Sequence, residues 1–252
     1  MINNKKVLVE VCANSVTSAL AAQKGGASRV ELCQNLKEGG TTPSFGEILM
    51  ARKLLYIDLY VLIRPRGGDF LYTDLEFEIM QKDVEQCINL GCDGIVIGIL
   101  NKDGSVDIKR NGMLINMAEK AGLGITFHRA FDMCADMHYA LENLIELGCE
   151  RILTSGGMPK AYAGLENLKR LIDKANNRII IMPGSGINEE NAKEIVNFTG
   201  ASEIHLSARS TIKSKMDYIN INISMGRDSG NEYLIDVTDA NMVSQILNAF
   251  NN

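Results

Sequence analysis

The sequence predicts an α/β protein, a single (β/α)8 TIM barrel over residues 1–252 with a β-hairpin insertion before its last helix. Eight strand-like runs alternate with helix-like segments along the chain. Strands that are joined by helical crossovers pair in parallel, and eight such units in a chain of this length form one barrel. The active face of such a barrel lies at the C-terminal strand ends, so the polar residues that end these runs should converge there.

The expected strands have apolar cores and polar C-terminal ends, and they cover residues 7–12, 29–33, 59–66, 94–100, 124–132, 151–156, 179–186 and 203–207. The expected helices show the three-to-four spacing of helices packed on a sheet, and they cover 15–25, 44–55, 76–90, 109–121, 137–147, 164–176, 189–199 and 240–250. Glycines that close a helix in the left-handed conformation precede five strands, at Gly26, Gly91, Gly122, Gly148 and Gly200. These turns mark the bottom of the predicted barrel.

The segment 209–239 does not fit a minimal barrel. Within it Ile219, Ile221 and Ile223 alternate with polar residues, and the glycines between 226 and 230 predict a turn into a second short strand. We expect a hairpin that caps the barrel opening or forms an oligomer contact. Capping is favoured because the segment leaves the top face, and we expect the protein to be a homo-oligomer.

Composition limits the partners and the compartment. Hydrophobic residues make up 46% of the chain and the net charge is −5, which argues against nucleic acid or an anionic membrane as the main partner. No apolar run is long enough to span a bilayer and no signal-like segment precedes the first strand, so we expect a cytoplasmic protein. Its six cysteines should therefore be reduced thiols, and we expect structural roles for Cys87, Cys92 and Cys149.

Alternation along the first two strands predicts a metal site. Side chains two residues apart share a face, which places Glu10, Cys12, Glu31 and Cys33 inside the barrel at its upper end. Two thiolates on neighbouring strands suit Cu(I), and they suit zinc if a Glu or His completes the shell. The alternative is that both cysteines are small packing residues.

A second set of residues predicts an anion site at the same face. Arg64 and Arg66 share the inward parity, and two guanidiniums can hold a phosphate or carboxylate. The alternative is that each arginine pairs with Glu10 or Glu31 and neutralises it. Glycine-rich turns after the sixth and seventh strands expose backbone amides that can bind a phosphate. The candidate substrate-binding residues are Arg64, Arg66, Asp69, Arg129, Asp132, Ser155, Gly157, Gly186, His205 and Ser207.

His128 is one of only three histidines and lies at the end of the fifth predicted strand. It is a candidate general acid or base, a metal ligand or a structural hydrogen-bonding group. In an enzyme it would act with Glu10 or Glu31 as the catalytic group. Whether Cys134, in the loop after the same strand, joins the site stays open.

Several motifs together resemble the CutC family: Glu10-Val11-Cys12 and the segments 26–33, 39–44, 63–70, 126–132, 153–156 and 205–209. The resemblance runs in order from about residue 7 to the C-terminus. It implies a (β/α)8 barrel associated with cytoplasmic copper homeostasis, with Cu(I) bound by Cys12 and Cys33. The main hypothesis is therefore a Cu(I)-binding protein. The rival is an enzyme acting on a small phosphorylated or carboxylated metabolite, and an assembly protein without chemistry would leave the clustered acids and histidine unexplained.

Overall fold

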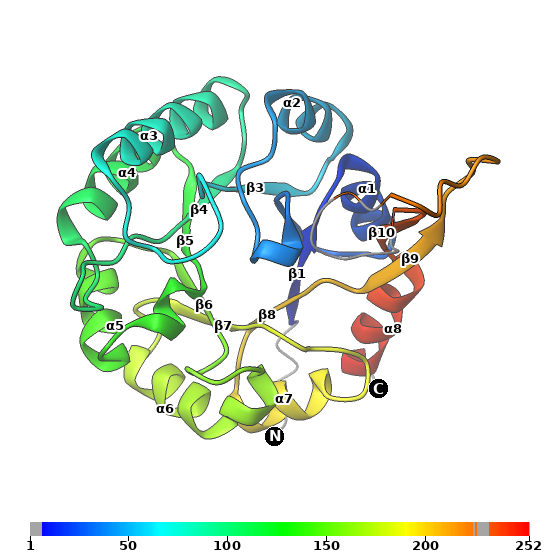
Figure 1. Ribbon diagram of the computed structural model, residues 1–252. Helices are drawn as coiled ribbons and strands as arrows, with labels where there is room; N and C mark the ends of the chain where they lie inside the picture. Colours follow the sequence, from blue (N-terminus) through cyan, green and yellow to red (C-terminus); the bar gives the residue numbers. More distant parts are fainter. Residues whose placement is uncertain (1–6, 224, 226–231, 252) are drawn as a thin grey trace.

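The computed structural model describes residues 7–223, 225 and 232–251. Eight strands form one parallel sheet in the order β7-β6-β5-β4-β3-β2-β1-β8, and this sheet curls into a nearly closed barrel (Figure 1). The strands are β1 (Leu8–Ala13), β2 (Arg29–Leu32), β3 (Asp58–Leu62), β4 (Gly94–Ile97), β5 (Gly124–Phe127), β6 (Arg151–Thr154), β7 (Ile180–Pro183) and β8 (Glu203–Leu206). The predicted TIM barrel is confirmed.

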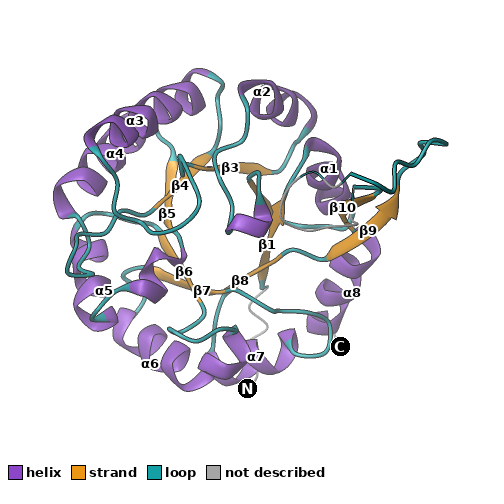
Figure 2. Cartoon of the chain, in the orientation of Figure 1, coloured by secondary structure: helices purple, strands orange, loops and turns teal. Residues whose placement is uncertain are grey.

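Helices surround the strands on the outside (Figure 2). They are α1 (Val16–Lys24), α2 (Phe45–Leu54), α3 (Asp74–Asn89), α4 (Ile108–Lys120), α5 (Met137–Glu146), α6 (Leu165–Ala175), α7 (Ala192–Thr199) and α8 (Ala240–Asn251). Short 3-10 helices follow three strands: η1 (Leu36–Glu38), η2 (Arg129–Met133) and η3 (Ala161–Gly164). All five glycines expected to close helices have positive φ angles. None of the helices in the described part of the chain is long and apolar enough to cross a membrane.

Several strands end earlier than the sequence pattern predicts. β3 ends at Leu62, so Arg64 and Arg66 follow in a loop, and β5 ends at Phe127. His128 then caps η2, its Nδ1 accepting a hydrogen bond from the backbone N–H of Ala130. Strand alternation does not continue through a loop or a 3-10 helix. Arg64 and His128 nevertheless line the pocket at the barrel mouth, as inward parity predicts, and Arg66 does not.

The two faces of the sheet bury different chemistry. Val9, Val11, Val30 and Leu32 belong to the large apolar cluster that packs between the strands and the helices. The side chains that alternate with them point into the barrel, and many of these are charged: Glu10, Arg29, Glu31, Arg151, Glu203 and His205 are all at most 9% exposed. The barrel interior is therefore held by ion pairs where branched apolar residues usually predominate.

Tyr60 fills the lower interior of the barrel. The guanidinium carbons of Arg29 and Arg151 each lie 5.0 Å from its ring centroid, and its hydroxyl donates to Glu150 at 2.9 Å. A Cβ added to Gly124 would lie 1.9 Å from the Tyr60 hydroxyl oxygen. β5 thus begins with a glycine because the tyrosine occupies the space that a side chain would need.

The insertion after β8 forms a hairpin, as predicted, with the second strand near its expected position and a different first strand. β9 (Arg209–Lys213) pairs antiparallel with β10 (Leu234–Thr238). The segment with Ile219 and Ile221 is not a strand, and these side chains are 54% and 88% exposed. The predicted turn at 226–230 lies outside the described residues. The hairpin projects beside α1 and away from the barrel opening (Figure 1), so the favoured capping position is not observed.

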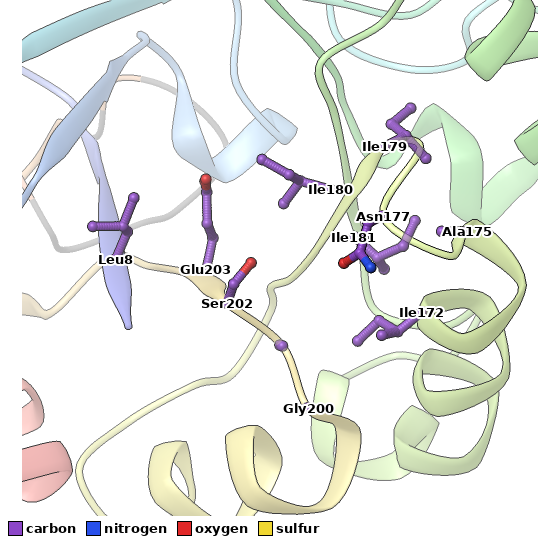
Figure 3. A pocket seen from close by; sticks show the side chains of 11 residues that line it. Leu8, Ile172, Ala175, Asn177, Ile179, Ile180, Ile181, Gly200, Ser202 and Glu203 are labelled. Carbon is purple, nitrogen blue, oxygen red and sulfur yellow. The ribbon is translucent and has the colours of Figure 1, made fainter. Parts of the chain in front are cut away.

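A cavity of about 340 Å³ lies at the bottom of the barrel, beside β1, β7 and β8 (Figure 3). Leu8, Ile180, Ile181 and Glu203 contribute to its wall. Apart from the carboxylate of Glu203, the side chains labelled around it are mostly aliphatic (Figure 3). The described residues that line this cavity include no thiol and no imidazole.

Candidate metal centre

A pocket of about 370 Å³ opens at the C-terminal ends of the strands. Cys12, Glu31, Cys33 and His205 lie on one side of it, on β1, β2 and β8 and just after β2. Arg64, Phe70, His128, Arg129, Ser185, Gly186, Ser207 and Arg209 line the remainder. This is the face on which the sequence predicts the functional residues to converge.

The two cysteines expected to bind a metal lie in contact. The Sγ atoms of Cys12 and Cys33 are 3.3 Å apart, and the residues are 8% and 0% exposed. The backbone register sets this arrangement, because Cys12 stands opposite Glu31 on β2 and the N–H of Cys33 donates to Ala13. Both thiols are free. Two adjacent sulfur ligands with one side open to a pocket fit a soft ion.

His205 connects this thiol pair to two carboxylates. Its Nδ1 lies 2.7 Å from Glu10 Oε1, and its Nε2 lies 3.5 Å from Glu31 Oε2. Ligand atoms of Cys12, Glu31 and His205 all lie within 4.8 Å of one another. Sulfur, nitrogen and oxygen donors are therefore brought together within the space that one ion needs.

A chain of buried ion pairs supports His205 from below. Glu10 pairs with Arg29 Nε, and the NH2 group of Arg29 lies 2.5 Å from Glu203. Glu203 also accepts from Arg151 Nε at 3.2 Å. Each of these side chains is at most 5% exposed. Charges so far from water persist only when each has a partner, so the chain fixes Glu10 and, through it, the histidine ring.

The pKa values around the site follow from this arrangement. Burial alone would raise the pKa of Glu10, but Arg29 and His205 outweigh it and lower the pKa to about 2. Burial opposes a charge on His205, yet its bonds to Cys12 and Glu10 and the nearby charge of Glu31 raise its pKa well above the usual range. The bond to Cys33 and burial raise the pKa of the Cys12 thiol. In the metal-free protein the site therefore holds an imidazolium and a protonated thiol.

His128 has the opposite character. Burial, and then the charge of Arg64, lower its pKa to about 3. Its Nδ1 accepts from Ala130, so the proton of the neutral ring is on Nε2, which is buried and has no hydrogen-bond partner. With its ring on the pocket wall, His128 is a neutral donor at physiological pH and a poor general base.

The two arginines of the expected anion clamp do not meet. The terminal nitrogens of Arg64 donate to the backbone carbonyls of Glu38, Gly40 and Gly68 at 2.7–2.9 Å. Arg66 instead pairs with Asp69 and Glu76, outside the pocket. The alternative of pairing with Glu10 or Glu31 was also wrong, because Arg29 holds Glu10.

Four further candidates, Arg129, Asp132, Ser155 and Gly157, form a cluster at the rim of the pocket. The carboxylate of Asp132 accepts from the backbone N–H groups of Ser155 and Gly157 at 3.0 Å, and Arg129 pairs with the same carboxylate. The amides of Ser155 and Gly157, in one of the two loops expected to hold a phosphate, are thus already bound to a protein carboxylate. Cys134 lies nearby, with its Sγ 3.6 Å from the carbonyl of Ala130, and it does not line the pocket.

Sequence reasoning missed Arg29, Arg151 and Glu203. A usable signal was present, because Arg29 alternates with Glu31 and Glu203 alternates with His205, on the inward parity of their strands. The prediction considered only the upper ends of the strands. It therefore found the acids and thiols at the pocket but not the ionic layer beneath them.

Comparisons with known proteins agree with this architecture. The model of the CutC family matches residues 7–210. A CutC family protein from Bacteroides fragilis is 52% identical over 223 residues, 88% of each chain, and one from Bacteroides thetaiotaomicron is 51% identical over 97% of this chain and 98% of its own.

Solved structures give the same result. A CutC from Streptococcus agalactiae, described as a candidate copper homeostasis protein, superposes with a TM-score of 0.76 at 38% identity, covering 80% of this chain and 98% of its own. Thiamine phosphate pyrophosphorylase from Pyrococcus furiosus reaches 0.60 at 16% identity over 98% of this chain and 97% of its own, a likeness of fold alone. The family resemblance found in the sequence is confirmed.

Proposed function

We propose that this chain, which belongs to the CutC family, is a cytoplasmic copper homeostasis protein that binds Cu(I) through the thiolates of Cys12 and Cys33. One observation supports this most directly, the 3.3 Å separation of the two Sγ atoms beside an open pocket. Thiolates are the protein ligands that Cu(I) prefers. The name of the Streptococcus agalactiae relative, which refers to copper homeostasis, supports the same role.

The groups around Cys12 and Cys33 favour the binding of Cu(I) by the two thiolates. Binding Cu(I) requires both thiols to lose their protons, and two thiolates with one Cu(I) carry one net negative charge. The imidazolium of His205, which lies beside Cys12 and is 9% exposed, offsets that charge in a largely buried environment. His205 therefore stabilises the bound state even if it does not touch the ion.

An anaerobic Cu(I) titration against a competing chelator tests the proposal. Wild type should compete with the chelator, and Cys12→Ser and Cys33→Ser should each lower the affinity by about 100-fold or more, because a hydroxyl replaces a thiolate. Cys134→Ser is the matched control, since this thiol lies outside the pocket. Weak binding in wild type, or equal loss in all three variants, would refute the two-thiolate site.

The pocket supports a second candidate, an enzyme that acts on a small phosphorylated or carboxylated metabolite. The observation that favours it is His128, whose unpartnered Nε2–H donor is buried on the wall of a cavity large enough for a small molecule. Arg64, Arg129, Gly186 and Ser207 would contact the ligand. His205 with Glu10 or Glu31, rather than His128, would move protons.

Inorganic phosphate is a direct probe of this second function. Its binding, followed by chemical-shift changes at constant ionic strength, should weaken in His128→Asn and persist in Cys12→Ser. A response that is absent, or equal in both variants, would refute the enzyme and leave Cu(I) binding as the remaining proposal.

We also propose that the protein is a homo-oligomer. The contact would be formed by Ile212 and Ile235, which lie opposite one another on the projecting hairpin and are half-exposed.

A further inference from the structure

The thiol pair is surrounded by more ligands than Cu(I) requires. Glu31 and His205 are 5% and 9% exposed, and each offers an atom within 4.8 Å of the other and of a ligand atom of Cys12. Cys33 adds a second sulfur at 3.3 Å from the first. Buried carboxylates and imidazoles are costly to maintain, so a cluster that combines both with two thiols needs a reason.

His205 is oriented as histidine ligands usually are. Its Nδ1 faces Glu10 at 2.7 Å, and Arg29 holds that carboxylate in place. Nε2 is thereby turned toward Glu31 and the thiols. A carboxylate that binds one ring nitrogen fixes the ring orientation, and the other nitrogen coordinates once the metal has displaced its proton, which is the usual arrangement around zinc.

The distances are close to those of a tetrahedral site. Ion–sulfur bonds of about 2.3 Å place two thiolates about 3.8 Å apart, and bonds of about 2.0–2.1 Å to nitrogen and oxygen place those atoms about 3.4 Å apart. The protein has 3.3 Å between the sulfurs and 3.5 Å between His205 Nε2 and Glu31 Oε2. The two sulfurs must separate by roughly half an ångström to admit the ion. Cys33 lies outside the group whose ligand atoms are within 4.8 Å of one another, so its thiol must also move toward Glu31 and His205.

We infer that Cys12, Cys33, His205 and Glu31 form a four-ligand site for a divalent cation of the zinc class. The inference rests on the proposed function in so far as both place a metal on the same two thiols. It also predicts which ligands distinguish Cu(I) from a divalent ion at this site. Cu(I) needs only the sulfurs, whereas a divalent ion of borderline softness also needs the nitrogen and the oxygen. The pocket therefore binds two classes of metal with two overlapping ligand sets.

Cobalt(II) is a suitable probe, because tetrahedral Co²⁺ bound to thiolates absorbs visible light strongly and the hydrated ion does not. Anaerobic titration of the full chain should give this spectrum, and Zn²⁺ should displace it. Glu31→Gln and His205→Gln should each lower the Co²⁺ affinity by about 100-fold or more and change the Cu(I) affinity less than about 10-fold. Glutamine at position 205 retains a donor for Glu10, and His138→Gln, an exposed histidine of α5, is the matched control.

The outcomes separate the two hypotheses. A tetrahedral Co²⁺ spectrum without competitive Cu(I) binding would refute the copper proposal and retain the four-ligand site. Cu(I) binding with Co²⁺ that stays hydrated, or that binds equally in Glu31→Gln and His205→Gln, would overturn this inference alone. If both variants misfold, X-ray absorption of the Zn²⁺-loaded wild type decides: two sulfur and two lighter ligands support the site, and any other shell contradicts it.

Discussion

The protein contains two pairs of adjacent thiols, and their surroundings differ. Cys12 and Cys33 lie inside the barrel at its upper end, beside a pocket and a cluster of charged groups. Cys87 and Cys92 are also close enough to shift one another's pKa, but they lie in the apolar layer between helices and strands, at the end of α3 and in the turn before β4. Proximity of two sulfurs is thus common to a candidate metal centre and to ordinary packing.

The neighbours of each pair account for the difference. Among the described residues, one group of three His, Cys, Asp or Glu side chains has ligand atoms close enough for a single ion, and it contains Cys12. In the part of the chain that the structure describes, Cys87 and Cys92, the lower pair, belong to no such group, and they line neither the pocket at the top of the barrel nor the cavity at its bottom. A thiol pair becomes a metal site when the fold adds further donors, charge compensation and access.

The largest effect is expected from breaking the ionic layer under the upper pair. Arg29→Met removes the cation that Glu10 and Glu203 share, and it leaves Glu10 with His205 and Glu203 with Arg151. The loss of these two buried pairs should lower the free energy of unfolding by about 3–5 kcal/mol. Arg52→Met removes the ion-pair partner of Asp93, which follows Cys92 in the chain. It should lower the free energy of unfolding by only about 1 kcal/mol, because the Arg52–Asp93 ion pair is partly exposed. Urea denaturation of both variants measures the contrast. Equal losses would mean that the interior charges do not stabilise the upper end.

The buried titratable groups of the upper end should also make stability depend on pH. His128 is neutral in the folded state down to a pKa of about 3, whereas in the unfolded chain it takes up a proton near pH 6.5. The unfolded state therefore binds one more proton, and stability falls by about 1.4 kcal/mol per pH unit as pH drops below 6.5. His128→Asn keeps an acceptor for the Ala130 N–H. It should reduce the slope of stability against pH by about 1.4 kcal/mol per pH unit, the contribution of one proton. An unchanged slope would show that His128 is not held neutral.

A smaller effect is expected at the lower pair. Cys87→Ser places a hydroxyl in an apolar layer and should cost about 1–2 kcal/mol of stability. Because this pair has no further donors, Cu(I) affinity should stay within about 3-fold of wild type. Thermal unfolding and a chelator competition on the same sample check both. A marked loss of Cu(I) binding would place part of the metal at the bottom of the barrel and remove the distinction between the pairs.

The sequence predicts the barrel and the upper thiol pair for a clear reason. The alternation of side chains predicts where Cys12 and Cys33 lie only if each strand reaches its cysteine. β1 extends past Cys12, and β2 ends one residue before Cys33. The same reasoning placed Arg64 at the pocket correctly but failed for Arg66, because the strand had already ended. Strand ends depend on loop hydrogen bonds to distant residues, which a single sequence does not reveal.

The roles of the two site histidines were also hard to predict. His128 and His205 both follow apolar runs, but a neighbouring guanidinium makes one neutral, and two carboxylates and a thiol make the other a cation. These partners come from other strands and loops. Their identity requires the three-dimensional register, which no local pattern contains.

The most direct test compares the two thiol pairs in one experiment. Cu(I) affinity should be measured anaerobically, against a competing chelator, for the double variants Cys12→Ser/Cys33→Ser and Cys87→Ser/Cys92→Ser. The account predicts that the first loses tight binding and the second binds as wild type does. Retained binding in the first variant, or an equal loss in both, would contradict the claim that the upper end of this barrel is the metal centre.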